Sequence, residues 1–123
     1  MSIPSDYTDI IFDLLQATKD SRVNWQNENH TIVVRLPKTR VKLWSGTDEE
    51  TNLPFVSFAL TDVSGRNLDS WAVDEGDPDF DTMHTLYSLS RRIAFGIPER
   101  LKDLRYLLAT SSTIGEEEED IPF

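Results

Sequence analysis

The stretch from Thr82 to Ala109 constrains the fold most, because it has the pattern of two amphipathic helices that need a surface to pack against. Gly96 is typical of a helix end and Pro98 of a helix start, so they mark the break between the two helices. Stripes of this kind are usually buried, and we predict that both close a core against a β-sheet. The stripes consist of Met83, Leu86, Tyr87, Ile93 and Ala94 in the first helix, and Leu101, Leu104, Leu107 and Leu108 in the second.

Five short runs with alternating apolar and polar side chains supply the predicted sheet. The connections between the runs are too short for parallel crossovers, so neighbouring strands must be antiparallel. A helix over about residues 5–19 comes first, with Pro4 and Ser5 at its start. The predicted fold is an α+β two-layer sandwich: an N-terminal helix, a five-stranded antiparallel meander, and a C-terminal helical pair, all on one face of the sheet. The predicted strands are residues 22–26, 30–36, 39–45, 53–61 and 68–73.

A length of 123 residues corresponds to one domain. We assign residues 1–109 to a single α+β domain and residues 110–123 to an acidic flexible tail, whose short apolar end could also act as a docking peptide. The sequence has no Cys, which excludes disulfides, thiolate nucleophiles and thiolate metal sites. We find no signal peptide and no run of 18 apolar residues, and therefore expect a cytoplasmic protein that does not enter the membrane.

The net charge of −10 is unevenly distributed. Residues 22–46 and 83–109 carry net charges of +4 and +3, whereas residues 47–82 carry −9. Such a chain disfavours nucleic acid and anionic membranes as partners and could attract a basic protein partner. The open alternative is that the acidic charge serves solubility alone. The basic residues of 83–109 are interpreted as a solvated face that also pairs with the acidic loops.

The acidic loop at residues 74–81 is the first candidate for chemistry. Asp77, Asp79 and Asp81 have the spacing of the first three ligands of an EF-hand loop, but Thr82 and Ser88 stand where that loop needs Gly and Glu. A weak cation site, a solvated loop and a docking site for a basic partner all remain open.

Other catalytic or metal-binding patterns are missing from the sequence. The two histidines, His30 and His84, have no Cys or third His to complete a protein-ligated zinc site. No serine lies in a nucleophile motif, and no glycine-rich phosphate loop occurs. We therefore expect no cofactor, no metal and no enzymatic activity.

The sheet face that points away from the helices is the preferred candidate surface. If the apolar alternating positions of the strands face the helices, this second face combines three cations with two aromatic side chains, a mixture common at binding surfaces. An open alternative is that the two aromatic rings pair across adjacent strands and only shield the sheet. The candidate binding residues are Arg35, Arg40, Lys42, Trp44 and Phe55.

Three patterns in the chain resemble a group of small uncharacterised bacterial proteins. They are Leu14-Leu15-x-x-Thr18-Lys19-x-x-x-Val23-x-Trp25, Gly65-x-x-Leu68, and Leu86-Tyr87-x-Leu89-x-Arg91-Arg92-x-Ala94-x-Gly96-Ile97. The similarity spans about residues 7–108. It implies a fold with an N-terminal helix, an antiparallel sheet and two C-terminal helices, and it implies no activity.

From these patterns we expect a non-enzymatic, acidic interaction module that binds another protein, for example an inhibitor or immunity-type protein. The partner could be basic, and a homodimer is an alternative. The main competing hypothesis is a small anionic-ligand-binding or sensor domain that uses the exposed sheet face. In both hypotheses the helical pair of residues 82–109 serves as scaffold.

Overall fold

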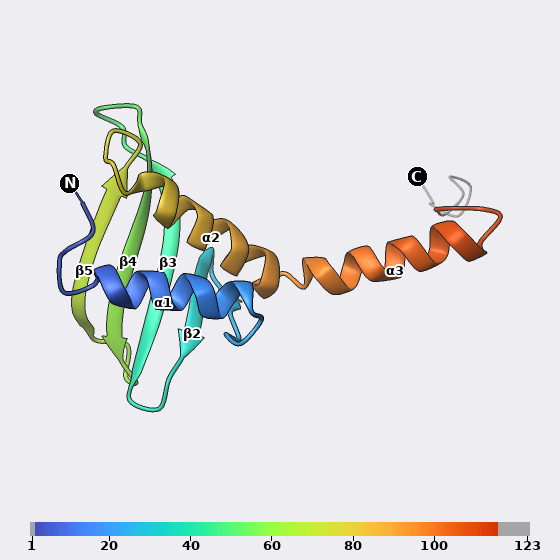
Figure 1. Cartoon of the computed structure of the whole chain (residues 1–123), viewed down its shortest axis with the longest axis horizontal. Coiled ribbons are helices and arrows are strands. Elements are labelled where there is room, and N and C mark those ends of the chain that lie inside the picture. Colours follow the sequence, from blue (N-terminus) through green and yellow to red (C-terminus); the bar gives the residue numbers. More distant parts are fainter. Residues whose placement is uncertain (1, 116–123) are drawn as a thin grey trace, which may run out of the picture.

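The computed structural model describes residues 2–115 and confirms the predicted α+β class, with one helix before the strands and two after them. The five strands form one antiparallel sheet in sequence order, β1-β2-β3-β4-β5, as predicted (Figure 1). The predicted tail lies mostly outside the described residues. The elements are α1 (Thr8–Lys19), β1 (Gln26–Glu28), β2 (Thr31–Arg35), β3 (Thr39–Thr47), β4 (Pro54–Asp62), β5 (Asn67–Asp74), α2 (Phe80–Ala94) and α3 (Ile97–Thr110).

The core lies between one face of the sheet and the two helices α1 and α2, which both run across that face (Figure 1). Strand pairing aligns one row of apolar residues across four strands, and α1 and α2 contribute fully buried residues above it. This confirms that the apolar alternating positions of the strands face the helices, and it places Trp71 and Val73 of β5 on the same face. The row is Ile32, Leu43, Phe58 and Trp71, and the helix residues above it include Ile11, Met83 and Leu86.

The first strand starts later than predicted. Residues 22–25 are not paired, because Trp25 follows α1 into the core: its side chain is 2% exposed, and Nε1 donates to Thr18 Oγ1 at 3.0 Å. Pairing with β2 begins only at Gln26. The turn is also displaced, since Asn29 and His30 both have positive φ angles, of 48° and 68°. Two such residues form the type I′ loop that joins the strands of a tight hairpin, so His30 lies in the turn and does not open β2.

The hairpin between β4 and β5 turns at Val63-Ser64, where the N–H of Gly65 donates to the carbonyl oxygen of Asp62 at 3.0 Å. Gly65 has φ +94°, a conformation that glycine adopts without steric cost. The carboxylate of Asp62 accepts hydrogen bonds from the Ser64 hydroxyl and from the backbone N–H of Arg66. These bonds favour the charged form and hold the pKa of Asp62 below its usual value.

Helices α1 and α2 begin at slightly different residues than expected. Helix α1 starts at Thr8 and not at Ser5, and α2 starts at Phe80 and not at Thr82, with Asp79 at the N-cap position. Asp79 does not cap the helix through its side chain. Its Oδ2 instead accepts the backbone N–H of Ile3 at 2.8 Å, which ties the N-terminal segment to the start of α2.

Helix α3 differs most from the prediction. It leaves the body at the end of α2 and extends away from the sheet (Figure 1), and among the other elements it contacts only α2. None of its fourteen residues is buried, and from Pro98 onwards all are exposed. The expectation that its leucine stripe closes the core is therefore wrong. Because α1 and α2 already bury the helix-facing side of the sheet, the core is complete without α3.

Candidate functional site

One side of α3 carries a row of exposed apolar side chains. Ile97, Leu101, Leu104 and Leu108 follow one another at spacings of four, three and four residues, which places them in a line along one side of a helix. Leu107 extends this line sideways. We call Leu101, Leu104, Leu107 and Leu108 the α3 stripe, and their side chains are 37%, 45%, 47% and 60% exposed.

Charged residues lie beside and within the α3 stripe. Successive helical residues are rotated by about 100°, so Arg105 lies at one edge of the stripe and Asp103 at the other, whereas Arg100 lies between Leu104 and Leu107. Tyr106, which is 69% exposed, lies on the opposite side of the helix. The surface thus combines an apolar strip with a cation at one edge and a carboxylate at the other, a combination that complements an apolar groove with opposite charges on its two rims. The sequence already contained these positions, but only the structure shows them uncovered.

The direction of α3 is set by a short elbow between the helices. Gly96 adopts a left-handed conformation with φ +64°. Arg100 Nε donates to the carbonyl oxygen of Phe95 at 3.1 Å, and this bond satisfies an acceptor at the end of α2. The guanidinium of Arg91 lies 4.7 Å from the centre of the Phe95 ring. These contacts all involve the first turn of α3 or the last turn of α2.

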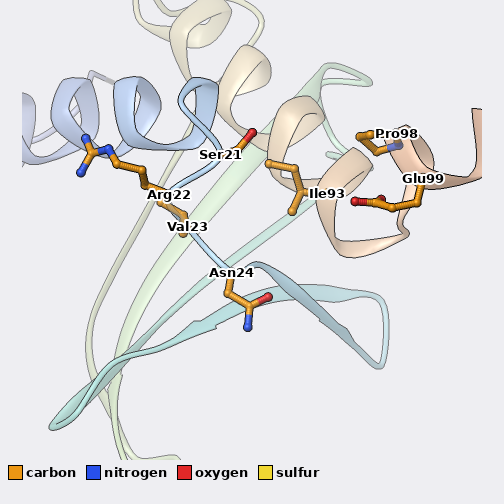
Figure 2. A pocket seen from close by; sticks show the side chains of 7 residues that line it. All are labelled: Ser21, Arg22, Val23, Asn24, Ile93, Pro98 and Glu99. Atoms are coloured by element: carbon orange, nitrogen blue, oxygen red, sulfur yellow. The ribbon is translucent and has the colours of Figure 1, made fainter. Parts of the chain in front are cut away.

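A pocket of about 320 Å³ lies in the angle of this elbow (Figure 2). Figure 2 shows Glu99 reaching from the start of α3 towards Ile93 of α2, while the side chain of Arg22 points away from both. The charged groups at the elbow therefore do not converge on the pocket. Beyond its first turn α3 has little support, because among the other elements it contacts only α2. The lining residues are Ser21, Arg22, Val23, Asn24, Ile93, Pro98 and Glu99.

The five predicted binding residues lie on the sheet face away from α1 and α2, because their positions alternate with the buried row. Arg40, Lys42, Trp44 and Phe55 are half-buried, and Arg35 is exposed. The structure thus brings the predicted set together on one surface that no described helix covers.

Several of these side chains have a structural role on that face. Arg35 Nη2 is 2.9 Å from Glu28 Oε2, so its charge is paired. The ring of Phe55 lies over Gly46, where an added Cβ would come within 2.9 Å of Phe55 Cζ. Trp44 stands opposite Ser57 and Phe55 opposite Gly46, so the two rings are not directly opposite each other.

The small residues in the middle of this face are buried although no helix lies above them. Val33 is 1% exposed and Ala59 is 6% exposed, and both are direct neighbours of Lys42 in the sheet. Long side chains on the same face can cover such positions with their aliphatic stems. The face is therefore partly shielded by its own residues, which leaves less free apolar surface than on α3.

The acidic loop uses its carboxylates for backbone contacts. Asp77 Oδ2 accepts the N–H of Asp74 at 2.8 Å, and Asp79 is bonded to Ile3. Asp81 lies in the first turn of α2. Within residues 2–115, no group of three His, Cys, Asp or Glu side chains is placed to hold a metal ion.

The two histidines lie apart from each other. His84 stacks on Phe80 with 5.5 Å between ring centres, and His30 lies in the β1–β2 turn.

The expected pairing of the basic residues of α2 and α3 with the acidic loops is not seen within residues 2–115. The ion pairs among these residues join Arg22 to Asp20, Arg35 to Glu28 and Arg66 to Asp62.

No protein-family model, curated protein or solved structure matches this chain. None of the described helices is both long enough and apolar enough to cross a membrane.

Proposed function

We propose that this protein is a non-enzymatic interaction module that binds another protein, and that α3 is the element it presents. The observation that carries the proposal is the exposed α3 stripe. Soluble domains seldom leave a contiguous row of four leucines in water, and such rows usually mark a contact surface. The contact would be of the helix-in-groove type, in which side chains three and four positions apart anchor a helix in an apolar groove.

The energetics favour a partner that both covers and stabilises the helix. Full burial of a leucine side chain contributes roughly 1.5–3 kcal/mol, and the stripe has four half-exposed leucines. A helix of fourteen residues that contacts only one other element, α2, gains little stability from packing, and isolated helices of this length are only marginally stable in water. Covering the stripe would therefore order α3 and bury its leucines in the same step.

The charges beside the stripe indicate the chemistry of the partner. Arg105 and Asp103 would meet the two rims of a groove, so a carboxylate on the first rim and a cation on the second would increase the rate and the specificity of binding. The acidic segment of residues 47–82 would attract basic groups of a partner to a different part of the surface than α3. An inhibitor or immunity-type protein would be one form of such a module.

Affinity purification from the native host tests the proposal when it compares matched variants. Tagged wild type and Tyr106→Asp should retain the same partner, because Tyr106 lies on the far side of α3. The double variant Leu101→Asp/Leu108→Asp should lose it, because two carboxylates in the stripe would have to be desolvated in the groove. Identical profiles for all three proteins would refute the role of α3.

A variant of the other surface separates the two hypotheses for the site. Trp44→Ala combined with Arg40→Glu changes the sheet face and leaves α3 untouched. Retention of the partner by this variant supports α3, whereas its loss would move the binding site to the sheet face. Sedimentation analysis tests whether the partner is a second copy of the chain. In that case the wild type would be a dimer and Leu101→Asp/Leu108→Asp would be a monomer.

A further inference from the structure

One corner of the helix-facing side breaks the apolar pattern of the core. Asn27 is paired with Ile32 and Ser45 is paired with Val56, so both polar residues point to the face that carries the core. At the same corner α2 presents Tyr87 and Arg91, which are one helical turn apart. Positions where local pattern and fold disagree are often functional.

These residues surround a pocket of about 240 Å³. Three strands, one turn and one helix meet there, and most of the side chains around it are polar. The lining residues are Asn27, His30, Ile32, Ser45, Tyr87, Arg91 and Phe95. This pocket lies on the other side of the sheet from the candidate residues Arg40 and Lys42, so it is a separate site.

The polar side chains around the pocket have free hydrogen-bonding capacity. Among residues 2–115, the Arg91 guanidinium has the Phe95 ring at 4.7 Å as its partner and no carboxylate. Glu28, which precedes the turn, points to the opposite sheet face and is held there by Arg35 at 2.9 Å. The pocket therefore keeps one uncompensated positive charge in a chain of net charge −10.

His30 is held in an unusual backbone conformation at the rim of this pocket. Its φ of 68° is in the left-handed region, which costs a residue with a side chain roughly 1 kcal/mol and favours glycine at this turn position. Such conformations are frequent at binding sites, where a side chain has to be directed at a ligand.

We propose that this pocket binds a small phosphate-bearing anion. Arg91 supplies a fixed charge and parallel N–H donors, and Asn27, His30, Ser45 and Tyr87 can each donate one further hydrogen bond. Five donor groups exceed what the two oxygens of a carboxylate need and suit a tetrahedral oxyanion. The volume is below the roughly 300–1,000 Å³ of sites for drug-sized ligands, so the phosphate would carry only a short substituent.

Titration of the full-length protein with inorganic phosphate tests the site directly. In ¹H–¹⁵N correlation spectra at pH 7 and constant ionic strength, we expect saturable shifts at Asn27, His30 and Arg91 below about 20 mM phosphate. Acetate should bind more weakly over the same range. Arg91→Gln should weaken phosphate binding by about tenfold or more, because it removes the charge-assisted bonds.

Arg92→Gln is the matched control, since it removes the same charge from the neighbouring residue, which does not line the pocket. It should leave phosphate binding unchanged within about twofold. Shifts that stay linear and equal those produced by chloride would overturn the proposal. An equal loss of phosphate affinity in Arg91→Gln and Arg92→Gln would also overturn the proposal, because the affinity would then depend only on the overall charge of α2. None of these outcomes depends on whether α3 binds a protein partner.

Discussion

At the scale of single residues, Tyr7 connects the helix layer to the sheet. Its ring contacts Phe58 and Trp71 at centre distances of 5.2 and 5.6 Å, and its hydroxyl donates to Asp69 Oδ2 at 2.7 Å. Burial and, secondly, the hydrogen bond to the Asp69 carboxylate raise the pKa of Tyr7 to about 12. Both causes disfavour the phenolate, because the anion would lose its hydration and face another negative charge.

The raised pKa of Tyr7 predicts a loss of stability in alkali. The unfolded phenol ionises near pH 10, so the contribution is complete below pH 10 and disappears as the pH rises towards 12. Over that window the wild type should lose about 1–3 kcal/mol of unfolding free energy that Tyr7→Phe does not lose. Urea unfolding at a series of pH values measures the difference.

Two features make this test specific to Tyr7. Tyr7→Phe should itself cost about 1 kcal/mol at pH 7, since it removes the bond to Asp69. Tyr106→Phe is the control, because Tyr106 is 69% exposed and its loss should leave the alkaline slope unchanged. Parallel pH profiles for the wild type and Tyr7→Phe would contradict the assignment.

At the scale of elements, α3 shows that helix formation and helix burial depend on different information. Pro98 in the first turn and Gly96 before it are local signals that start the helix whatever surrounds it. The periodic leucines indicate that the helix has an apolar side, but whether that side is buried depends on the rest of the molecule. The same kind of stripe is buried in α2, where Leu86 is 0% exposed, and uncovered in α3, where Leu104 is 45% exposed.

This contrast predicts that the same substitution destabilises the protein strongly in α2 and hardly at all in α3. Leu86→Ala should cost about 2–5 kcal/mol, because it leaves a cavity in a packed core. Leu104→Ala should cost no more than about 0.5 kcal/mol, because the side chain contacts solvent and alanine keeps the helix propensity. Urea unfolding at low protein concentration compares the two. A cost above about 1.5 kcal/mol for Leu104→Ala would show that the α3 stripe is buried in solution.

At the scale of the whole molecule, the folded body and the projecting helix are separable. The core residues all lie between Ile3 and Leu86, and the partly buried ones around them extend only to Ala94. Helix α3 adds length to the molecule without adding to this core (Figure 1). The described chain thus consists of an α+β body from which one amphipathic helix projects.

A chain that ends after Gly96 should therefore fold. We expect its melting temperature to lie within about 3 °C of that of the full chain, because none of the residues removed is buried among those that the structure describes. Circular dichroism should show the same β content and a smaller helical signal. Unfolding of the shortened chain at room temperature would show that α3 contributes to the body.

Much of the body could be predicted from the sequence because its causes are local. Alternation with a period of two and short connections require antiparallel neighbours, and both can be read within about ten residues. This reasoning placed Arg40, Lys42 and Trp44 on the correct sheet face. It misplaced the first strand, because Trp25 is buried by its contact with Thr18 of α1 and not by pairing in the sheet. The alternation of residues within a strand contains no information about such a contact.

The amino-acid sequence by itself determined the class of the fold, the order of the elements and the existence of an apolar stripe on α3. Only the tertiary structure decided which stripes are covered, that Tyr7 meets Asp69 across 62 positions of chain, and that Asn27, Ser45, Tyr87 and Arg91 share one pocket. The physical reason is that periodicity reports which side of an element is apolar. Burial depends on how much of the sheet the other helices already occupy, and α1 and α2 occupy enough of it to leave α3 free.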